Sequence, residues 1–214
     1  MDKKYAIFDM DGTLVDSMRY WKNLAADYLY SKGIKKLPPD LKERIKPMTM
    51  SQSAEMFINE FGIKGSPLSV EEEMNRMMDD HYINDIGLKD GVKEYISGLS
   101  RSGVRMCVAS ATAEELVTGC LSRLGIYDYF EFAISCDSAG VGKDSPDIYY
   151  MAADRLGADP KDIAVYEDAL YAIRTARDAG FYVVGVYDDN SGSRWEKIRQ
   201  TADETIRSWK GEIK

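Results

Sequence analysis

Short hydrophobic runs recur along the chain, and most of them are continuously apolar rather than alternating between apolar and polar. They lie at residues 5–8, 104–109, 132–134, 163–166 and 182–187. A strand without alternation is typical of a parallel sheet that is covered by helices on both faces. The pattern therefore predicts five strands of a buried parallel sheet.

Helical stripes separate the later runs. Val117, Cys120, Leu121 and Leu124 are spaced by steps that place them on one helical face, and residues 148–156 carry a similar stripe. Strands that alternate with helices of this kind are typical of α/β proteins. We therefore expect an α/β fold for this half of the chain.

Residues 16–82 break the alternation, because they contain helical stripes but no convincing strand. The segment begins after the first predicted strand and ends before the helix expected at Val92. We predict a helical cap domain over 16–82, inserted into a core domain of residues 1–15 and 83–214. In this interpretation the cap is a lid at the carboxyl edge of the sheet, which disfavours macromolecular substrates.

Composition narrows the class of function. Hydrophobic residues make up 44% of the 214 residues and the net charge is −8, which favours a folded protein that does not bind nucleic acid. The three cysteines form no CxxC motif, and no apolar run approaches the length of a membrane helix. We expect a cytoplasmic protein with no membrane partner. A single histidine argues against a His-rich zinc site and a serine–histidine triad.

The first predicted strand is followed by two carboxylates at i and i+2 and then a glycine, in the stretch Asp9-Met10-Asp11-Gly12-Thr13. Alternation along an extended chain points Asp9 and Asp11 to the same side. Ligands of open α/β sheets bind at the carboxyl ends of strands. On its own the stretch is equally typical of a polar turn.

A serine ends the strand predicted at 104–109. Thr112 and Glu115 match the capping-box pattern at the start of the next helix, so we expect Thr112 to cap that helix. The hydroxyl of Ser110 would then be unused and available to bind an anion. This expectation depends on the local helix start.

Two further strand ends carry charge. Lys143 precedes a helix for which Ser145 is the expected N-cap and Pro146 the first residue, and an ammonium near the positive end of a helix is unfavourable unless an anion binds there. Glu167 and Asp168 follow the strand at 163–166. Because like charges repel, an acidic pair facing two more carboxylates indicates a cation between them.

Together these groups suit phosphoryl transfer. Carboxylate oxygens without histidine or thiolate ligands favour Mg²⁺ over zinc. A carboxylate is a competent nucleophile toward phosphorus, and a second one can protonate the leaving oxygen and then activate water. A hydroxyl and an ammonium suit the phosphate oxygens.

The sequence resembles the haloacid dehalogenase superfamily, in particular its capped phosphatases and β-phosphoglucomutase-like phosphomutases, over nearly the whole chain. The matching stretches, in the order of the family motifs, are residues 9–17, Ser110, Gly142-Lys143 with Ser145-Pro146-Asp147, and Glu167-Asp168. The resemblance implies a Rossmann-like parallel sheet core with an inserted α-helical cap.

The resemblance also implies roles. Asp9 would be the nucleophile that becomes an aspartyl phosphate, and Asp11 the general acid and then base. The residues expected to bind the phosphoryl group of the substrate are Ser110, Ala111 and Lys143. The expected Mg²⁺ ligands are Asp9, Asp11 through its backbone carbonyl, Glu167 directly or through water, and Asp168. The implied activity is hydrolysis of a small phosphorylated metabolite, such as a sugar phosphate or a phosphoglycolate-like ester.

Departures from the family pattern bear on the subfamily. Ala169 follows the acidic pair in place of Ser or Thr, Trp21 stands where phosphomutases carry a hinge histidine, and Lys46-Pro47-Met48 stands where their cap has a glycine-containing loop. Trp21 and the loop at Lys46-Pro47-Met48 favour a phosphatase over a phosphomutase, which remains the alternative, whereas Ala169 bears on the fine geometry of the site. Asp11 argues against a dehalogenase or a phosphonoacetaldehyde hydrolase.

A response-regulator-type receiver combines similar residues but places its acidic pair first, so the order of motifs disfavours it. Three basic residues near the expected lid or sheet edge, Arg19, Lys46 and Arg194, are interpreted as solvated surface charges. His81 is interpreted as part of the packing of the cap. The sequence does not predict an oligomeric state.

Overall fold

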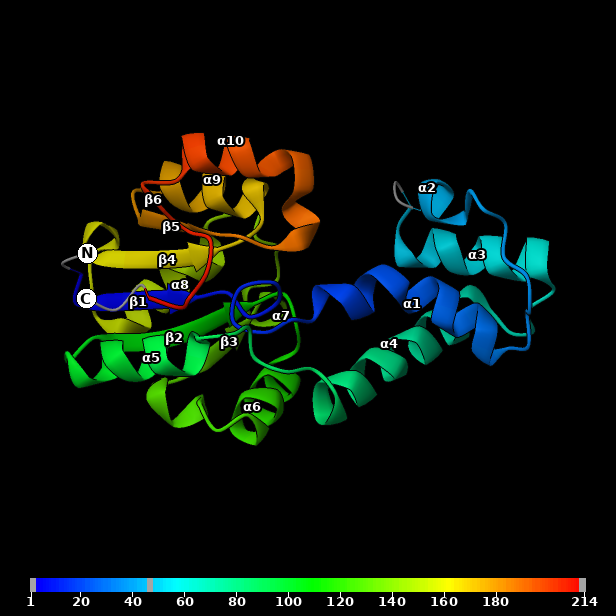
Figure 1. Ribbon diagram of the computed structural model, residues 1–214, viewed down its shortest axis with the longest axis horizontal. Coiled ribbons are helices and arrows are strands. Elements are labelled where there is room, and N and C mark those ends of the chain that lie inside the picture. The colour runs from blue at the N-terminus through cyan, green and yellow to red at the C-terminus, as the bar shows by residue number, and fades with distance from the viewer. Residues whose placement is uncertain (1–2, 46–47, 212–214) are drawn as a thin grey trace. The chain divides into compact units, whose positions relative to one another are not determined.

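The computed structural model describes residues 3–45 and 48–211 (Figure 1). It divides into two compact units, one formed by the residues up to Met18 together with those from Ile86 onward, and the other by Arg19–Asp85. The boundaries between core and cap predicted from the sequence, after residues 15 and 82, stay a prediction. Lys46 and Pro47 of the predicted cap loop lie outside the described residues.

The larger unit is built on a six-stranded sheet whose strand order is β3-β2-β1-β4-β5-β6. The strands are β1 (Tyr5–Phe8), β2 (Arg105–Ser110), β3 (Ala133–Ser135), β4 (Ile163–Glu167), β5 (Tyr182–Val186) and β6 (Glu204–Ile206). All of the pairings are parallel, which confirms the predicted parallel α/β sheet. The sequence analysis missed β6, because this edge strand is three residues long and begins with two polar residues.

Continuous apolar runs arise because both faces of the central strands are buried. On one face Ile7 packs in a cluster with residues of β2, β4 and three helices, which are α8 (Asp147–Leu156), α9 (Leu170–Asp178) and α10 (Trp195–Thr201). On the other face the ring of Phe8 stacks on Tyr166 with centroids 4.2 Å apart, and Tyr95 of α5 donates or accepts a hydrogen bond of 2.8 Å with the Tyr166 hydroxyl. The helices of this unit are α5 (Val92–Arg101), α6 (Glu114–Arg123), α7 (Cys136–Ala139), α8 (Asp147–Leu156), α9 (Leu170–Asp178) and α10 (Trp195–Thr201).

The sheet register brings three strand ends together. Phe8, the last residue of β1, is paired with Val108 of β2 on one side and Tyr166 of β4 on the other. The strand that follows β1 along the chain, β2, lies on one side of it, and the later strand β4 lies on the other side. The end of β1 is therefore the switch point of the strand order, where open α/β sheets bind ligands. Asp9 occupies this position.

The smaller unit is helical, as predicted for the inserted segment. Its helices are α1 (Met18–Ser31, whose first residue belongs to the larger unit), α2 (Leu41–Ile45), α3 (Met50–Phe61) and α4 (Pro67–Asn84). The described part of Arg19–Asp85 contains no strand. Its core includes Tyr28, whose ring stacks on Phe57. His81 contacts Asp85 Oδ2 at 2.7 Å and the ring of Tyr20, in keeping with a packing role.

Two predicted helix starts were wrong. Helix α6 begins at Glu114 after Ala113, and Thr112 makes no capping box with Glu115. Helix α8 begins at Asp147 with Pro146 as N-cap and without a side-chain cap, because the Ser145 hydroxyl donates to the Asp147 carboxylate instead. In both places the hydroxyl that the local pattern assigns to the helix donates to a carboxylate instead, that of Asp11 for Thr112 and that of Asp147 for Ser145.

Candidate active site

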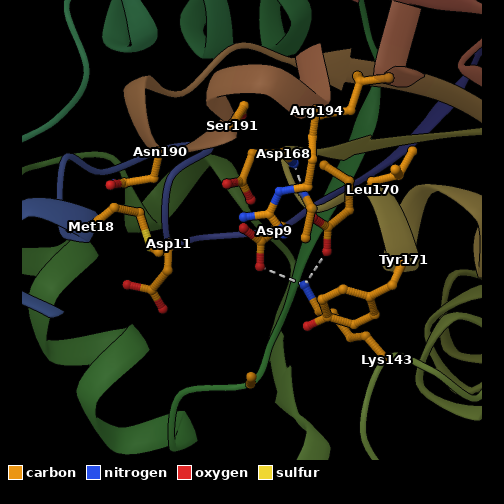
Figure 2. A pocket seen from close by; sticks show the side chains of 14 residues that line it. Asp9, Asp11, Met18, Lys143, Asp168, Leu170, Tyr171, Asn190, Ser191 and Arg194 are labelled. Carbon is orange, nitrogen blue, oxygen red and sulfur yellow. Dashed lines mark hydrogen bonds and ion pairs between the residues drawn. The ribbon is translucent and has the colours of Figure 1, made fainter. Parts of the chain in front are cut away.

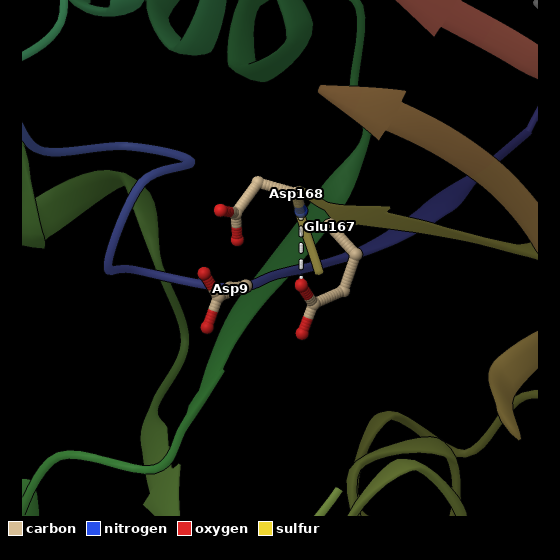
Figure 3. A group of neighbouring side chains, drawn as sticks. All are labelled: Asp9, Glu167 and Asp168. Atoms are coloured by element: carbon tan, nitrogen blue, oxygen red, sulfur yellow. Dashed lines mark hydrogen bonds between the residues drawn. The ribbon is translucent and has the colours of Figure 1, made fainter. Parts of the chain in front are cut away.

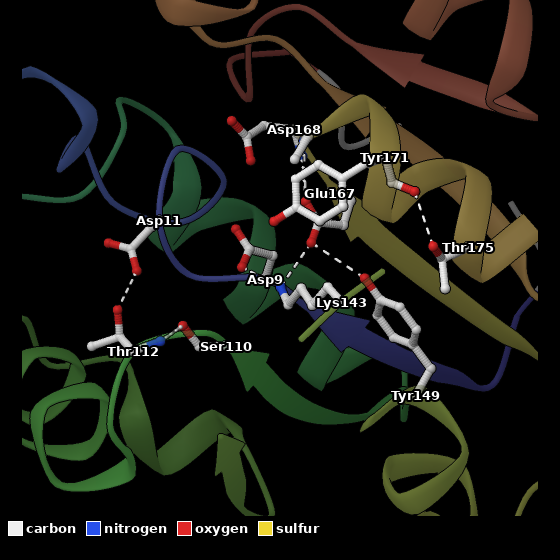
Figure 4. Close-up of polar contacts among 11 residues, drawn as sticks. Asp9, Asp11, Ser110, Thr112, Lys143, Tyr149, Glu167, Asp168, Tyr171 and Thr175 are labelled. Atoms are coloured by element: carbon white, nitrogen blue, oxygen red, sulfur yellow. Dashed lines mark hydrogen bonds and ion pairs between the residues drawn. The ribbon is translucent and has the colours of Figure 1, made fainter. Parts of the chain in front are cut away.

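Asp9 lies directly after β1 and is buried, with 7% of its surface exposed. Its backbone N–H donates to the carbonyl of Tyr166 at 2.9 Å, which extends the pairing with β4 and fixes the start of the loop. Its Oδ1 atom forms an ion pair with Lys143 Nζ (Figure 4). Its Oδ2 atom is buried and has no hydrogen-bond partner among the described residues. One carboxylate oxygen is therefore anchored, and the other has free acceptor capacity.

Lys143 bridges two strand ends. Its ammonium contacts Asp9 and also Glu167 Oε1 at 2.7 Å, and its side chain is almost fully buried. Burial by itself lowers the pKa of Lys143, but Asp9 and Glu167 outweigh that effect, so the pKa lies well above its usual value. Lys143 therefore remains a cation beside Asp9.

The Glu167 carboxylate accepts four hydrogen bonds. Oε1 accepts from Lys143 at 2.7 Å and from the Tyr149 hydroxyl at 3.3 Å, and Oε2 accepts from the backbone N–H groups of Asp168 at 2.9 Å and Ala169 at 3.1 Å. A carboxylate offers about four lone-pair positions, so these bonds use its acceptor capacity. In this arrangement Glu167 holds Lys143 and the start of the following loop.

Ser110 and Asp11 are connected through Thr112, a residue that the sequence analysis assigned to helix capping. The Thr112 N–H donates to Ser110 Oγ at 3.1 Å, and the Thr112 hydroxyl donates to Asp11 Oδ2 at 2.7 Å (Figure 4). The expectation that the Ser110 hydroxyl is unused was therefore wrong, because it accepts this N–H. A hydroxyl that accepts can still donate its own proton, so Ser110 retains a donor for an anion.

Gly12 makes room for Asp168. It has φ of +78°, which favours glycine, and a Cβ atom built on it would lie 2.6 Å from Asp168 Oδ2. The Asp168 carboxylate thus packs directly against the loop that carries Asp9 and Asp11. Any side chain at position 12 would displace it.

Three carboxylates form a group that could hold a metal ion. One oxygen from each of Asp9, Glu167 and Asp168 lies within 4.8 Å of the others (Figure 3). The Asp11 carboxylate is not in this group, because its side chain is turned toward Thr112, and the prediction that Asp11 binds a metal through its backbone carbonyl stays a prediction. Burial and the charge of Glu167 raise the pKa of Asp9 to about 8, and burial with Glu167 and Asp9 raises the pKa of Asp168.

These side chains line a cavity of about 250 Å³ (Figure 2). Its lining residues are Asp9, Asp11, Met18, Ala111, Lys143, Glu167, Asp168, Ala169, Leu170, Tyr171, Asn190, Ser191, Arg194 and Ile198. The sequence analysis missed Met18, Tyr171, Asn190 and Ser191, and it interpreted Arg194 as a solvated surface charge. These five residues belong to no motif. The loop after β5 brings Asn190, Ser191 and Arg194 to the cavity.

A family model for haloacid dehalogenase-like hydrolases matches residues 3–180 of the chain. The chain belongs to this family. It is similar to β-phosphoglucomutase of Bacillus subtilis, with 27% identity covering 95% of this chain and 92% of the relative, and to fructose-1-phosphate phosphatase YqaB of Escherichia coli, with 30% identity covering 87% and 98%. The predicted superfamily, its phosphatase and phosphomutase branch, and the prediction of an enzyme are confirmed.

A solved structure supports the same fold. The crystal structure of a putative β-phosphoglucomutase from Thermotoga maritima superimposes with a TM-score of 0.81 at 23% identity, covering 95% of this chain and 94% of that one. The predicted fold class is confirmed. Among the residues that the structure describes, no helix combines the length and the apolar character that a membrane span requires.

Haloacid dehalogenase-like hydrolases generally use Mg²⁺, and the residues present fit such an ion. The cluster offers only oxygen ligands, which a hard divalent cation prefers. The buried Oδ2 atom of Asp9 lacks a partner, and the pKa values of Asp9 and Asp168 are raised by burial and by the neighbouring carboxylates, both of which a bound cation would offset. Because Glu167 already uses its acceptor capacity, Asp9 and Asp168 are the side chains best suited to direct ligation.

Proposed function

We propose that this hydrolase is a Mg²⁺-dependent phosphatase that releases phosphate from a small phosphorylated metabolite through an aspartyl phosphate on Asp9. The observation that carries the proposal is the environment of Asp9, a buried carboxylate with one oxygen held by Lys143 and the other unpartnered, at the floor of a cavity. A nucleophile needs such a fixed position, and a carboxylate can present one oxygen to phosphorus while the other binds the metal ion.

In the first step an oxygen of Asp9 attacks phosphorus, and the bond from phosphorus to the leaving oxygen breaks. Lys143, a cation beside Asp9, offsets negative charge on the phosphoryl oxygens, and the backbone at Ala111, which lines the cavity, helps to orient them. The Ser110 hydroxyl, which is buried next to Ala111 and outside the cavity lining, is the further donor in this proposal. Asp11 donates a proton to the leaving oxygen, so that the alcohol departs neutral. The aspartyl phosphate remains on the enzyme.

In the second step Asp11, now a carboxylate, takes a proton from a water molecule as that water attacks phosphorus. The bond from phosphorus to the Asp9 oxygen breaks, which releases phosphate and restores Asp9. Thr112 holds Asp11 Oδ2 at 2.7 Å and so contributes to the position of this acid and base. The proton that Asp11 gives in the first step is thereby recovered in the second.

The Mg²⁺ ion would be held by Asp9 and Asp168 and by the backbone carbonyl of Asp11, and Glu167, whose oxygens already accept four hydrogen bonds, would take part through water. When bound, it would neutralise charge on the transferring phosphoryl group and on the acidic cluster. Glu167 keeps Lys143 in place through its own carboxylate.

A β-phosphoglucomutase-like phosphomutase is the second candidate, because a named β-phosphoglucomutase aligns with nearly the whole chain. A mutase would return the phosphoryl group from Asp9 to a sugar hydroxyl instead of to water. Relatives named as sugar or carbohydrate phosphatases favour hydrolysis of a sugar phosphate. A response-regulator-type receiver is disfavoured, because Asp9 follows the first strand and the acidic pair comes later, at the end of β4.

The proposal is tested by phosphate release from p-nitrophenyl phosphate and from a panel of sugar phosphates and 2-phosphoglycolate, with Mg²⁺ and with EDTA. Asp9→Asn is expected to abolish release, and Asp90→Asn is a control at a surface carboxylate that is 78% exposed. EDTA is expected to abolish release by the wild type. Equal rates for wild type and Asp9→Asn would refute the proposal, and conversion of β-glucose 1-phosphate to glucose 6-phosphate without net phosphate release would favour the mutase.

A further inference from the structure

One wall of the cavity comes from the loop that follows β5. Residues Asp189–Arg194 form a 3-10 segment, η3, and Asn190, Ser191 and Arg194 line the cavity together with Asp9. This wall belongs to the same compact unit as the carboxylates. No sequence motif marks it.

A buried carboxylate anchors this loop. Asp188 is 3% exposed, its Oδ1 atom accepts the N–H of Asn190 at 2.8 Å, and its carbonyl accepts the N–H of Ser191 at 2.8 Å. Its Oδ2 atom forms an ion pair with Lys89 at 2.9 Å, and Lys89 also donates to the carbonyl of Gly12. The η3 loop is therefore fixed to the end of β5 and to the loop that bears Asp11. The backbone from which the Arg194 side chain extends thus has a defined position.

Arg194 differs from Lys143, the other cation that lines the cavity. Lys143 is buried between two carboxylates, whereas Arg194 is exposed, and the described part of the chain gives it no hydrogen bond or ion pair. Figure 2 shows its side chain directed into the cavity, toward Asp9 and Asp168. Arg194 therefore has a guanidinium with donors to offer to a bound molecule.

The difference in burial indicates which part of a substrate Arg194 meets. The phosphoryl group must reach Asp9, which is 7% exposed and lies beside the buried Lys143. Arg194 is exposed and lines the same cavity, so the part of the ester that extends from Asp9 toward solvent can reach its guanidinium. A guanidinium binds carboxylate or phosphate oxygens with two parallel hydrogen bonds.

We propose that Arg194 is a specificity-determining residue that binds an anionic group on the leaving-group part of the substrate. The preferred substrate class is then a phosphate ester that carries a second oxyanion, either a carboxylate or another phosphate. This inference rests on the proposed phosphatase function and deepens it. Asn190 adds an amide on the same wall, which can contribute one more donor to that oxyanion.

The test compares two classes of ester with Arg194→Gln, Arg194→Lys and the control Arg174→Gln, an exposed arginine that does not line the cavity. The anionic class is 2-phosphoglycolate and fructose 1,6-bisphosphate, which separates a carboxylate from a phosphate. The other class is p-nitrophenyl phosphate and fructose 1-phosphate. Hydrogen bonds to charged groups predict a loss of kcat/KM of about ten- to hundredfold in Arg194→Gln on the anionic esters, chiefly through KM. Little change is expected on the others, with partial recovery in Arg194→Lys.

Binding to Asp9→Asn by calorimetry provides a readout without turnover. Addition of Arg194→Gln should weaken binding of 2-phosphoglycolate or of the bisphosphate by the same factor. Equal losses on both ester classes, no loss on either, or a wild type that neither binds nor hydrolyses an anionic ester would overturn the inference. Failure of the proposed function is distinguishable, because the wild type would then release phosphate from no ester of either class.

Discussion

Replacing Lys143 with methionine should destabilise the protein, whereas replacing its partner Asp9 with asparagine should not. Lys143 is the cation between two buried carboxylates, those of Asp9 and Glu167. Methionine has a side chain of similar length but no charge, so both carboxylates would lose their cation. Asparagine at position 9 keeps an oxygen that accepts from Lys143, and it removes a charge whose ionisation burial disfavours.

The size of the effect follows from the burial of the group. Removal of one partner from a buried ion pair costs about 3–5 kcal/mol. For a chain of this length each kcal/mol shifts the melting temperature by roughly 2–4 °C, so Lys143→Met should melt roughly 6–20 °C below the wild type. Asp9→Asn should lie within about 1 kcal/mol of the wild type or be more stable, because burial raises the pKa of Asp9 to about 8, and asparagine is a neutral isostere of the protonated acid that then predominates at pH 7.

Urea and thermal unfolding of the metal-free proteins at pH 7 measure both changes, and phosphate release should be lost in both variants. A drop in stability for Asp9→Asn as large as that for Lys143→Met would refute this reasoning. So would a Lys143→Met protein as stable as the wild type. The opposite behaviour of two inactive variants separates the electrostatic role of Lys143 from its part in chemistry.

The same pair of proteins gives a pH dependence. The pKa of Asp9 is raised to about 8 by burial and by Glu167, so the folded state holds this proton more tightly than the unfolded chain does. The corresponding stability is present at low pH and is lost as pH rises from about 4 toward 8. Metal-free wild type should therefore lose more stability between pH 5 and pH 8 than Asp9→Asn. Equal slopes in urea unfolding would contradict this expectation.

Two further substitutions test the support of the site. Gly12→Ala places a Cβ atom 2.6 Å from Asp168 Oδ2, so it should weaken activation by Mg²⁺ and destabilise the protein. The loss of stability should exceed that of Gly103→Ala, a control with the same φ of +78° and open space around it. Equal losses in thermal unfolding, with Mg²⁺ activation intact, would exclude the contact. Lys89→Met leaves the buried Asp188 without its ion pair and should cost about 3 kcal/mol in urea unfolding. Lys210→Met, which breaks an exposed pair screened by solvent, should change stability far less, and similar losses in the two lysine variants would contradict this assignment.

The sequence by itself determined the layered α/β core and the helical insert. Continuous apolar strands report burial on both faces, and burial is a property that each strand carries in its own residues. The order of the motifs likewise placed Asp9 and Asp168 at strand ends, because parallel strands bring their carboxyl ends to one edge. The register of β1 with β4 then made them neighbours, and Lys143 reaches them from the loop between α7 and α8 rather than from a strand end.

Only the tertiary structure decided which partner each polar group takes. The hydroxyl of Thr112 fits a local capping pattern, yet it bonds to Asp11, a residue far away in sequence. In the sequence Arg194 looks like any other surface charge. In the structure the hydrogen bonds of Asp188 hold its loop beside the cavity, which Arg194 lines. Hydrogen bonds and charges act over a few ångströms in space, and sequence patterns record distances only along the chain, so such pairings emerge when the strands are assembled.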